Sequence, residues 1–281
     1  MRKVFPIPVF VFLLTHMTEA QIPFLLTQGA TPKGKGKIGA GVGFEYLEKN
    51  QSPAPDNPRS LLRFFMATLR HGVAENVDYD LTWRGGLFAN HANGRRDFDW
   101  GDLSIWTKIA LLREGRAWLG LALQSGIKLP NTRYSPSKLG SNQMDFHSRV
   151  LISKGLGGAE LRGNLGFSIL GDPTNTGSQD DVYSLSFAGL HPVSGRGRLF
   201  VEFLGQTGYQ DHDEKLISRF GAIVEAEVIT WTVYGTIRLA GNNRDFATAF
   251  EHSENWSVGI FFQRSFSATL WDQEEEQRTR P

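Results

Sequence analysis

The chain has 281 residues, no cysteine and a formal net charge of +1. The absence of cysteine excludes disulfides, thiolate metal sites, cysteine nucleophiles and a lipidated N-terminal cysteine. The balanced charge, without a block of basic residues, argues against a nucleic-acid-binding protein.

The first 20 residues have the pattern of a secretory signal peptide. Arg2 and Lys3 form a basic end, an apolar run extends from Val4 to Leu14, and Thr18-Glu19-Ala20 is a small-x-small cleavage site. A transmembrane anchor is the alternative, but a spanning helix needs about 20 apolar residues and this shorter run contains two prolines. We therefore expect residues 1–20 to direct export and to be removed.

From Lys37 onward, stretches of about ten residues alternate between apolar and polar before a break. Residues 77–84, for example, run Val-Asp-Tyr-Asp-Leu-Thr-Trp-Arg. A period of two is the period of a β-strand, whose successive side chains point to opposite faces. The pattern predicts strands near 37–48, 60–71, 77–88, 100–112, 117–129, 145–154, 159–170, 182–190, 198–207, 215–224, 228–240 and 256–266.

The lengths of these strands and of their connections indicate a membrane barrel. Most strands have about 9–13 residues, whereas about 9–11 tilted residues cross a bilayer and about 5–6 are usual in soluble sheets. Long polar connections alternate with short turns, as in outer-membrane barrels. The long connections fall near 49–59, 89–99, 130–144, 171–181, 208–214 and 241–255.

The fold class predicted is all-β, an antiparallel transmembrane β-barrel of about 12 strands, with a range of about 10–14. The alternative is a soluble periplasmic β-sandwich, which would also alternate but needs neither the long strands nor the alternating loop lengths. We expect a signal peptide at 1–20, a periplasmic lead-in at 21–36, the barrel at 37–266 and a polar tail at 267–281. An even number of strands places both ends of the barrel on the short-turn, periplasmic side.

Charged and histidine side chains at the polar strand positions are expected to face the lumen. These candidates are Arg63, Asp78, Asp80, Arg84, Asp102, Lys108, Lys128, His147, Arg149, Glu160, Arg162, Glu202 and Arg238. They either line a polar conduit or form acid–base pairs that fill the interior, and their mixed signs argue against a strongly ion-selective channel. Because Phe65, Trp106 and Phe261 are also expected to face inward, we expect a narrow or partly plugged passage.

Several short motifs resemble the outer-membrane family of the meta-pathway of phenol degradation, a group of transporters. The motifs, in the family's order and spacing, are Thr31–Gly36, Trp100–Leu103, Gly126–Pro130, Asp145-Phe146 and Gly163–Phe167. The resemblance covers most of residues 30–170, whereas residues 171–266 match only in general pattern. It implies an outer-membrane location and passage of small, aromatic or hydrophobic compounds, and it brings no catalytic residues.

Three functions remain open: a channel or transporter for small molecules, a closed structural or adhesion barrel with partner-binding loops, and a barrel enzyme that acts on lipids. The enzyme needs a histidine and a serine on one face with an orienting polar group. No His-x-Ser pairing occurs after residue 20, although pairs on facing strands stay possible.

We expect the protein not to be an enzyme and to hold no catalytic residue, cofactor or metal. The acidic run Asp211–Glu214 could hold Ca²⁺, but such exposed charges are usually only solvated. The expected partners are outer-membrane lipid, the barrel-assembly machinery and a small-molecule permeant, with no nucleic acid.

Overall fold

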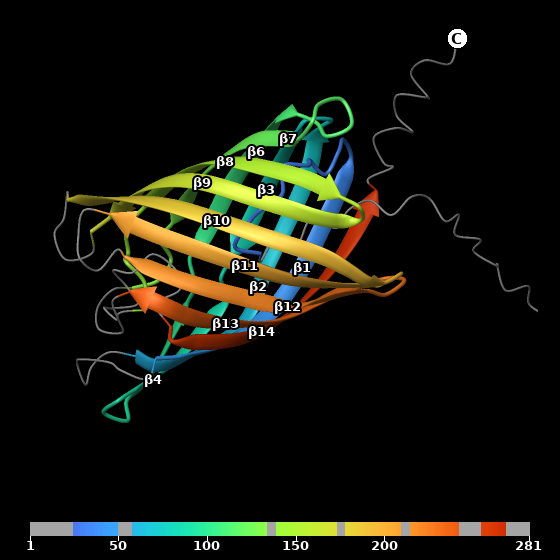
Figure 1. Cartoon of the computed structure of the whole chain (residues 1–281). Coiled ribbons are helices and arrows are strands. Elements are labelled where there is room, and N and C mark those ends of the chain that lie inside the picture. The colour runs from blue at the N-terminus through green and yellow to red at the C-terminus, as the bar shows by residue number, and fades with distance from the viewer. Residues whose placement is uncertain are drawn as a thin grey trace, which may run out of the picture.

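The computed structural model describes residues 25–49, 58–133, 139–172, 178–208, 214–241 and 254–267. They form one antiparallel β-sheet that closes into a barrel (Figure 1). In this part of the chain no helix is long and apolar enough to cross a membrane. The expected signal peptide and all but the first residue of the expected tail lie outside the described residues.

The strands follow one another around the barrel in chain order, with one local exception described below. They are β1 (Lys37–Glu48), β2 (Pro58–Ala74), β3 (Val77–Trp83), β4 (Gly86–His91), β5 (Arg96–Trp100), β6 (Leu103–Leu112), β7 (Gly120–Leu129), β8 (Asp145–Leu156), β9 (Ala159–Gly171), β10 (Gln179–Ser194), β11 (Gly197–Gly208), β12 (Lys215–Glu225), β13 (Thr230–Gly241) and β14 (Trp256–Ser267).

Two of the barrel strands are each interrupted once. β2 pairs with β3 in one half and with β4 in the other, and β3 and β4 pair in turn with β6 and β5. The break lies at Gly85, whose φ of +72° suits glycine and whose added Cβ would meet the carbonyl oxygen of Phe64. Counting β3–β4 and β5–β6 as single strands, the described residues form a twelve-stranded barrel, which confirms the predicted fold.

The β4–β5 hairpin occupies most of residues 89–99, which the sequence analysis assigns to a loop. On its outward face Phe88 packs against Phe98 with tilted rings, whose centroids are 4.9 Å apart. Its inward residues Leu87 and Ala89 are buried. Because the alternation continues past the expected strand end, the hairpin extends the wall at the end with the long connections (Figure 1).

β1 closes the barrel by pairing with strands on both of its sides. It pairs with β14 over its whole length, from Lys37 opposite Ser267 to Glu48 opposite Trp256, and with β2 on the other side. No open edge therefore remains between the first and last strands. β14 ends one residue beyond the Phe266 that the alternation predicts.

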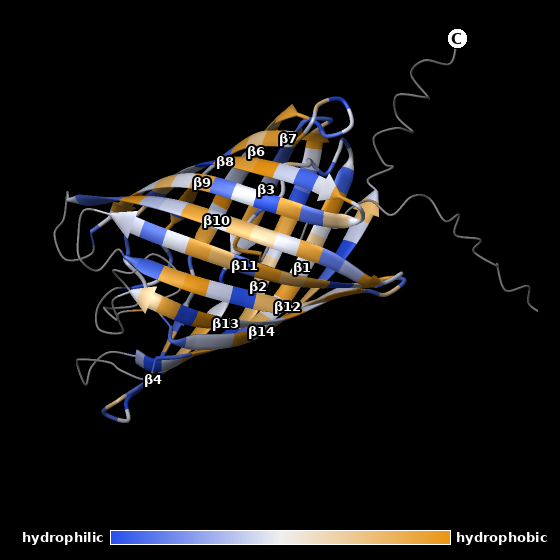
Figure 2. Ribbon diagram, in the orientation of Figure 1, coloured by the Kyte–Doolittle hydropathy of each residue, from blue (hydrophilic) through white to orange (hydrophobic). Residues whose placement is uncertain are grey.

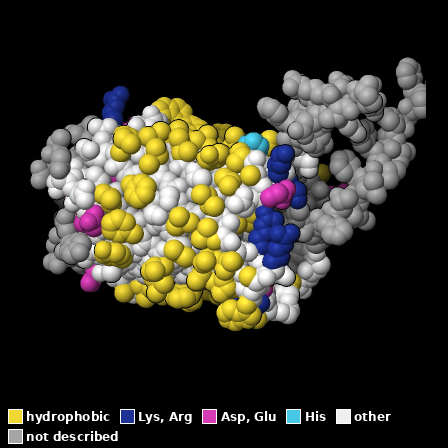
Figure 3. Space-filling view, turned by 90° about the horizontal axis from the view of Figure 1, so that it is seen from above, with side chains coloured by type: hydrophobic (Ala, Val, Ile, Leu, Met, Phe, Trp, Pro, Cys, Tyr) yellow, Lys and Arg dark blue, Asp and Glu magenta, His cyan; other side chains and the backbone are white. Residues whose placement is uncertain are grey.

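Alternation separates a polar inner face from an apolar outer face. On β9, Leu161 and Leu165 are 48% and 61% exposed, whereas Arg162 and Asn164 are buried. Figure 2 shows this alternation along the strands, and Figure 3 shows apolar side chains covering the middle of the wall with charged ones toward its ends. An apolar belt between polar ends is the surface that a bilayer requires.

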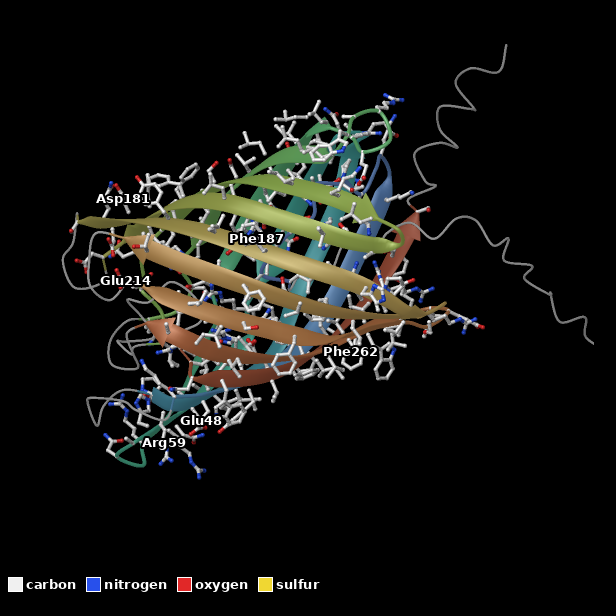
Figure 4. The ribbon with its side chains drawn as sticks, viewed as in Figure 1. Glu48, Arg59, Asp181, Phe187, Glu214 and Phe262 are labelled. Carbon is white, nitrogen blue, oxygen red and sulfur yellow. The ribbon has the colours of Figure 1, made fainter. Side chains whose placement is uncertain are left out.

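The two ends of the barrel differ. The end with the long connections, the loop end, carries the labelled Glu48, Arg59, Asp181 and Glu214, while Phe187 lies over the wall between the two ends (Figure 4). Arg59 and Glu48 form an ion pair of 3.5 Å there.

The opposite end, the turn end, carries a tryptophan and an exposed ion pair beside it. The side chain of Trp118 is 78% exposed. Lys154 Nζ lies 2.8 Å from the Glu114 carboxylate, and this hydrogen bond, with that from Gly155 N, lowers the pKa of Glu114. A tryptophan beside charged groups is typical of a membrane–water interface.

One inward assignment from the alternation is wrong. Phe65, expected in the lumen, points outward and is 56% exposed, because a β-bulge with φ +54° at this residue shifts the parity of β2. Trp106 and Phe261 do face inward, the latter only 1% exposed.

An arginine introduced on the outer face should impair assembly according to its depth. Leu165→Arg, at the middle of β9, should cost about 2–4 kcal/mol, whereas Leu156→Arg beside the turn end should cost about 0–1 kcal/mol. The measurement is the fraction of protein that refolds into vesicles, seen as the heat-modifiable band on a gel. Equal yields for the two variants would contradict the assignment of the outer face to lipid.

Candidate functional site

The N-terminal segment, residues 25–36, enters the barrel: residues 25–30 lie in the lumen, and residues 31–36, with Thr31 and Lys35 exposed, lead to the start of β1 at the turn end. Thr27 N donates to Glu202 Oε2 at 2.8 Å, and Gln28 N donates to Asn164 Oδ1 at 2.7 Å. These acceptors belong to the inner faces of β11 and β9. The segment expected as a periplasmic lead-in is thus held in the lumen, where wall side chains satisfy its backbone N–H groups.

Charged wall residues hold the segment nearer the turn end. Lys33 N donates to both carboxylate oxygens of Asp78, at 2.9 and 2.8 Å, and Lys108 Nζ donates to Gly29 O at 2.9 Å. Asp78 and Lys108 are fully buried. Buried charges are costly unless they are paired, so wall and segment stabilise each other.

An apolar anchor fixes the beginning of the described segment. Leu25 is 4% exposed and belongs to a buried cluster with residues of β10 to β13. The other members of the cluster are Ala188, Leu190, Phe200, Ile223 and Tyr234.

A second segment folds inward at the loop end. Asp102 Oδ1 accepts hydrogen bonds from Asn131 N at 2.8 Å and from Thr132 N at 2.9 Å, just after β7. Further along this β7–β8 connection, the mouth loop (residues 130–133 and 139–144), Leu139 packs into a buried cluster. The cluster contains Leu47, Leu61, Leu87 and Ala89, from β1, β2 and β4.

Lys128 fastens the same loop to two carboxylates. Its Nζ lies 2.6 Å from Asp145, 3.7 Å from Asp102 and 2.7 Å from Ser141 Oγ in the loop. The lumen is therefore narrowed from one end by the N-terminal segment and from the other by the mouth loop.

Within the barrel, beside the N-terminal segment, lies a cavity of about 180 Å³, the central cavity. Leu25, Leu26 and Gln28 of the N-terminal segment contribute to its lining. The rest comes from the inner faces of β1 to β3, β6 and β8 to β13, together with Arg84 between β3 and β4.

The central cavity carries mostly positive charge. Among the described residues that line it, the arginines are Arg63, Arg84, Arg149 and Arg219, and the single carboxylate is Glu45. Glu45 pairs with Arg63 at 2.9 Å and with Arg219 at 3.6 Å, so two arginines share one carboxylate.

Two aromatic rings lie against the cavity wall beside these arginines. Trp106 stacks on His147, with centroids 5.3 Å apart, and Arg149 lies over Trp106 at 4.8 Å. Arg219 lies over Tyr234 at 4.3 Å. These are cation–π distances.

Glycine on the neighbouring strand lets the larger ring lie flat. Gly126 is the register partner of Trp106, and a Cβ added there would lie 2.5 Å from the ring. Because the ring covers bare backbone, it leaves the centre of the cavity free.

The structure separates the lumen candidates of the sequence analysis into groups with different neighbours. The central cavity is lined by Arg63, Arg84, His147 and Arg149. The mouth loop is held by Asp102 and Lys128, and the N-terminal segment is held by Asp78, Lys108 and Glu202.

The remaining candidates interact with other residues of the barrel. Asp80 pairs with Arg70, Glu160 pairs with Arg162, and Arg238 donates to Glu254 O.

The candidate set did not include Arg219 and Tyr234. Both residues lie on predicted strands. For Arg219, a charged residue in the middle of the predicted strand 215–224 indicates an inward side chain. Nothing in the strand alternation predicts that residues 25–30 return into the lumen, since they precede the first strand.

No group of acidic, histidine or cysteine side chains suited to a metal ion occurs in the described ranges. Of the acidic run Asp211–Glu214, only Glu214 belongs to those ranges.

The fold and lumen define the protein as a closed transmembrane-type β-barrel with two inward-folded segments. A family model described as the MetA-pathway of phenol degradation matches residues 29–224. The chain belongs to this family.

Two solved barrels are similar in fold. The COG4313 outer membrane channel from Pseudomonas putida F1 superposes with a TM-score of 0.61 at 16% identity, over 83% of this chain and 96% of that one. The NanC porin superposes with a TM-score of 0.51 at 9% identity, over 82% and 98%. No curated protein matches the sequence.

Weakening the carboxylate contacts should release the N-terminal segment. The chain has no cysteine, so Ala30→Cys provides a single reporter that is buried in the lumen. Adding Asp78→Asn and Glu202→Gln should speed its reaction with a hydrophilic maleimide about tenfold, because charge-assisted hydrogen bonds are replaced by weaker neutral ones. Asp181→Asn at the loop end is the control, and equal acceleration by the control would contradict this anchoring.

Proposed function

We propose that the protein is an outer-membrane channel that passes small molecules, aromatic ones among them, through a lumen narrowed at both ends. The observation that carries the proposal is the arginine-lined central cavity inside a closed barrel, lined in part by an N-terminal segment that wall side chains hold in place. A barrel built only as a scaffold has no need of such a cavity.

The proposed location rests on the wall and on the N-terminal sequence. The outward face is apolar along the strands, and the first 20 residues have the pattern of an export signal. The turn end, where β1 begins and β14 ends, then faces the periplasm. Lipid and the barrel-assembly machinery are the partners that this location requires.

The barrel size fits a narrow conduit. Eight strands enclose a lumen that side chains fill, and about 16–18 leave an open aqueous channel. Twelve strands leave intermediate space, and here the N-terminal segment and the mouth loop occupy part of it. Residues 25–33 of the segment are held by contacts with side chains of the wall, so they can leave the lumen without opening the sheet.

The similar channel from Pseudomonas putida supports this proposal at the level of architecture. That protein is an outer membrane channel, and its barrel superposes on most of the present chain. The description of the family, a pathway of phenol degradation, supports aromatic compounds as permeants.

A closed barrel with binding loops is the first competing function. It predicts a lumen that stays shut whatever happens to the N-terminal segment. Conductance therefore discriminates between the two.

An enzyme is the second competing function, and one contact favours it. His147 Nδ1 lies 2.8 Å from Ser168 Oγ across facing strands, the distance of a base and its nucleophile. Both side chains are buried on the inner face, away from the lipid in which a phospholipid substrate would lie. We propose that this pair is a hydrogen bond of the cavity wall and that the protein is not an enzyme.

Planar-bilayer recording tests the channel. The full chain should give small, discrete current steps, and deletion of residues 25–33 should enlarge them severalfold because the segment leaves the lumen. A Gly/Ser stretch of equal length in place of 25–33 should enlarge them as well, since it lacks the apolar anchor. Silence from all three proteins, with insertion verified by protease protection, would favour the closed barrel.

Phospholipid turnover tests the enzyme. Vesicles that contain the protein should release no fatty acid above the level of protein-free vesicles. Release that disappears in Ser168→Ala, with the heat-modifiable band retained, would instead establish catalysis.

A further inference from the structure

We propose that the central cavity binds a small organic anion, a carboxylate carried on a single flat ring, and that the barrel selects anions for this reason. The proposal deepens the channel function and rests on it. The lumen as a whole contains both acids and bases, so its composition gives no sign of this selectivity. The acids and the bases nevertheless lie in different places: most acids hold chain segments, whereas the arginines line the cavity.

The carboxylates of the inner wall are mostly engaged outside the cavity. Glu202 and Asp78 accept backbone N–H groups of the N-terminal segment, Asp102 accepts those of the mouth loop, and Asp145 accepts Gly171 N at 3.0 Å. These acids are therefore committed to holding chain segments.

Arg149 is the arginine best placed to hold an anion. Its Nε donates to Gln124 Oε1 at 2.8 Å and its guanidinium lies over Trp106, but no described carboxylate lies within the 4.0 Å of an ion pair. A guanidinium carries five N–H donors in a planar fork that matches a carboxylate. Donors of Arg149 thus remain for a ligand.

Arg63 adds a second unsatisfied donor. Its NH1 donates to Glu45, while its buried Nε has no hydrogen-bond partner among the described residues. Unpaired buried donors are unusual in proteins, and one beside a polar cavity points to a ligand or solvent partner.

The remaining lining favours a small polar ligand with one flat face. Serine hydroxyls surround the arginines and can each donate a hydrogen bond, from Ser104, Ser168, Ser184 and Ser186. Trp106 offers a ring fixed by its stacking on His147. A cavity of about 150 Å³ accommodates benzene, so one of about 180 Å³ has room for one ring with a carboxylate.

Charge in a narrow lumen acts strongly on permeants. Low-dielectric walls focus the field of the arginines and raise the local concentration of the opposite ion. A cation is repelled from such a cavity, and a neutral aromatic compound gains the ring contact but not the bidentate ion pair of a carboxylate with a guanidinium.

Equilibrium dialysis of the purified full chain in detergent tests binding without requiring conductance. Benzoate should bind at least about tenfold more tightly than benzyl alcohol, its neutral counterpart. Arg149→Gln should weaken benzoate about tenfold and leave benzyl alcohol unchanged, and Trp106→Leu should weaken both. Arg238→Gln removes an inward arginine outside the cavity and should change neither.

Arg149→Lys keeps the proposal testable if Arg149→Gln does not fold, as judged by the heat-modifiable band. It retains the charge but loses the planar fork, so benzoate should weaken less than tenfold. Equal affinity for benzoate and benzyl alcohol, or equal losses in Arg149→Gln and Arg238→Gln, would overturn the anion site.

Reversal potentials in a KCl gradient test the selectivity. The full chain should favour chloride over potassium, and Arg149→Gln should reduce this preference more than Arg238→Gln does. Benzoate binding without any current would refute the channel and leave the site standing. Current that favours potassium would refute the site and leave the channel standing.

Discussion

The rest of this structure depends on closure of one hydrogen-bonded sheet. In a lipid environment each backbone N–H and C=O of the wall must be paired within the protein, and only a sheet without edges pairs them all. β1 meets this requirement by pairing with β14 and β2 at once. Closure also fixes the parity of each strand, since a slip of one residue would turn Arg162 toward lipid and Leu161 toward the lumen.

Because parity sends polar side chains inward, the lumen must satisfy them away from bulk water. The barrel does so in part with its own chain. The acids Glu202 and Asp78 receive backbone N–H groups of the N-terminal segment, and Asp102 receives those of the mouth loop. The same contacts narrow the passage, so satisfying the polar wall and restricting the lumen are one arrangement.

The arginines of the central cavity are used differently. Arg149 and Arg219 lie on Trp106 and Tyr234, and aromatic faces attract a cation without neutralising it. Most of the acids are committed to backbone groups, and Glu45 is shared by Arg63 and Arg219, so Arg149 in particular keeps charge to offer. A lumen that contains both positive and negative residues can thus present mainly positive charge at the place where a permeant must pass.

The alternation of the sequence predicts most of the strands and the face of nearly all inward residues, because a period of two is a local property that closure turns into inside and outside. It does not predict the β4–β5 hairpin, which lies largely in a stretch assigned to a loop. The inward position predicted for Phe65 is wrong, because a β-bulge reverses the inward–outward alternation of β2 and leaves no signal in the composition of the strand. The three-dimensional fold alone reveals that residues 25–30 return into the lumen, that Glu202 meets Thr27, and that Arg219 joins Arg63 at Glu45. These contacts join residues far apart in the chain, and their positions follow from the closed circumference of the barrel, which no local pattern encodes.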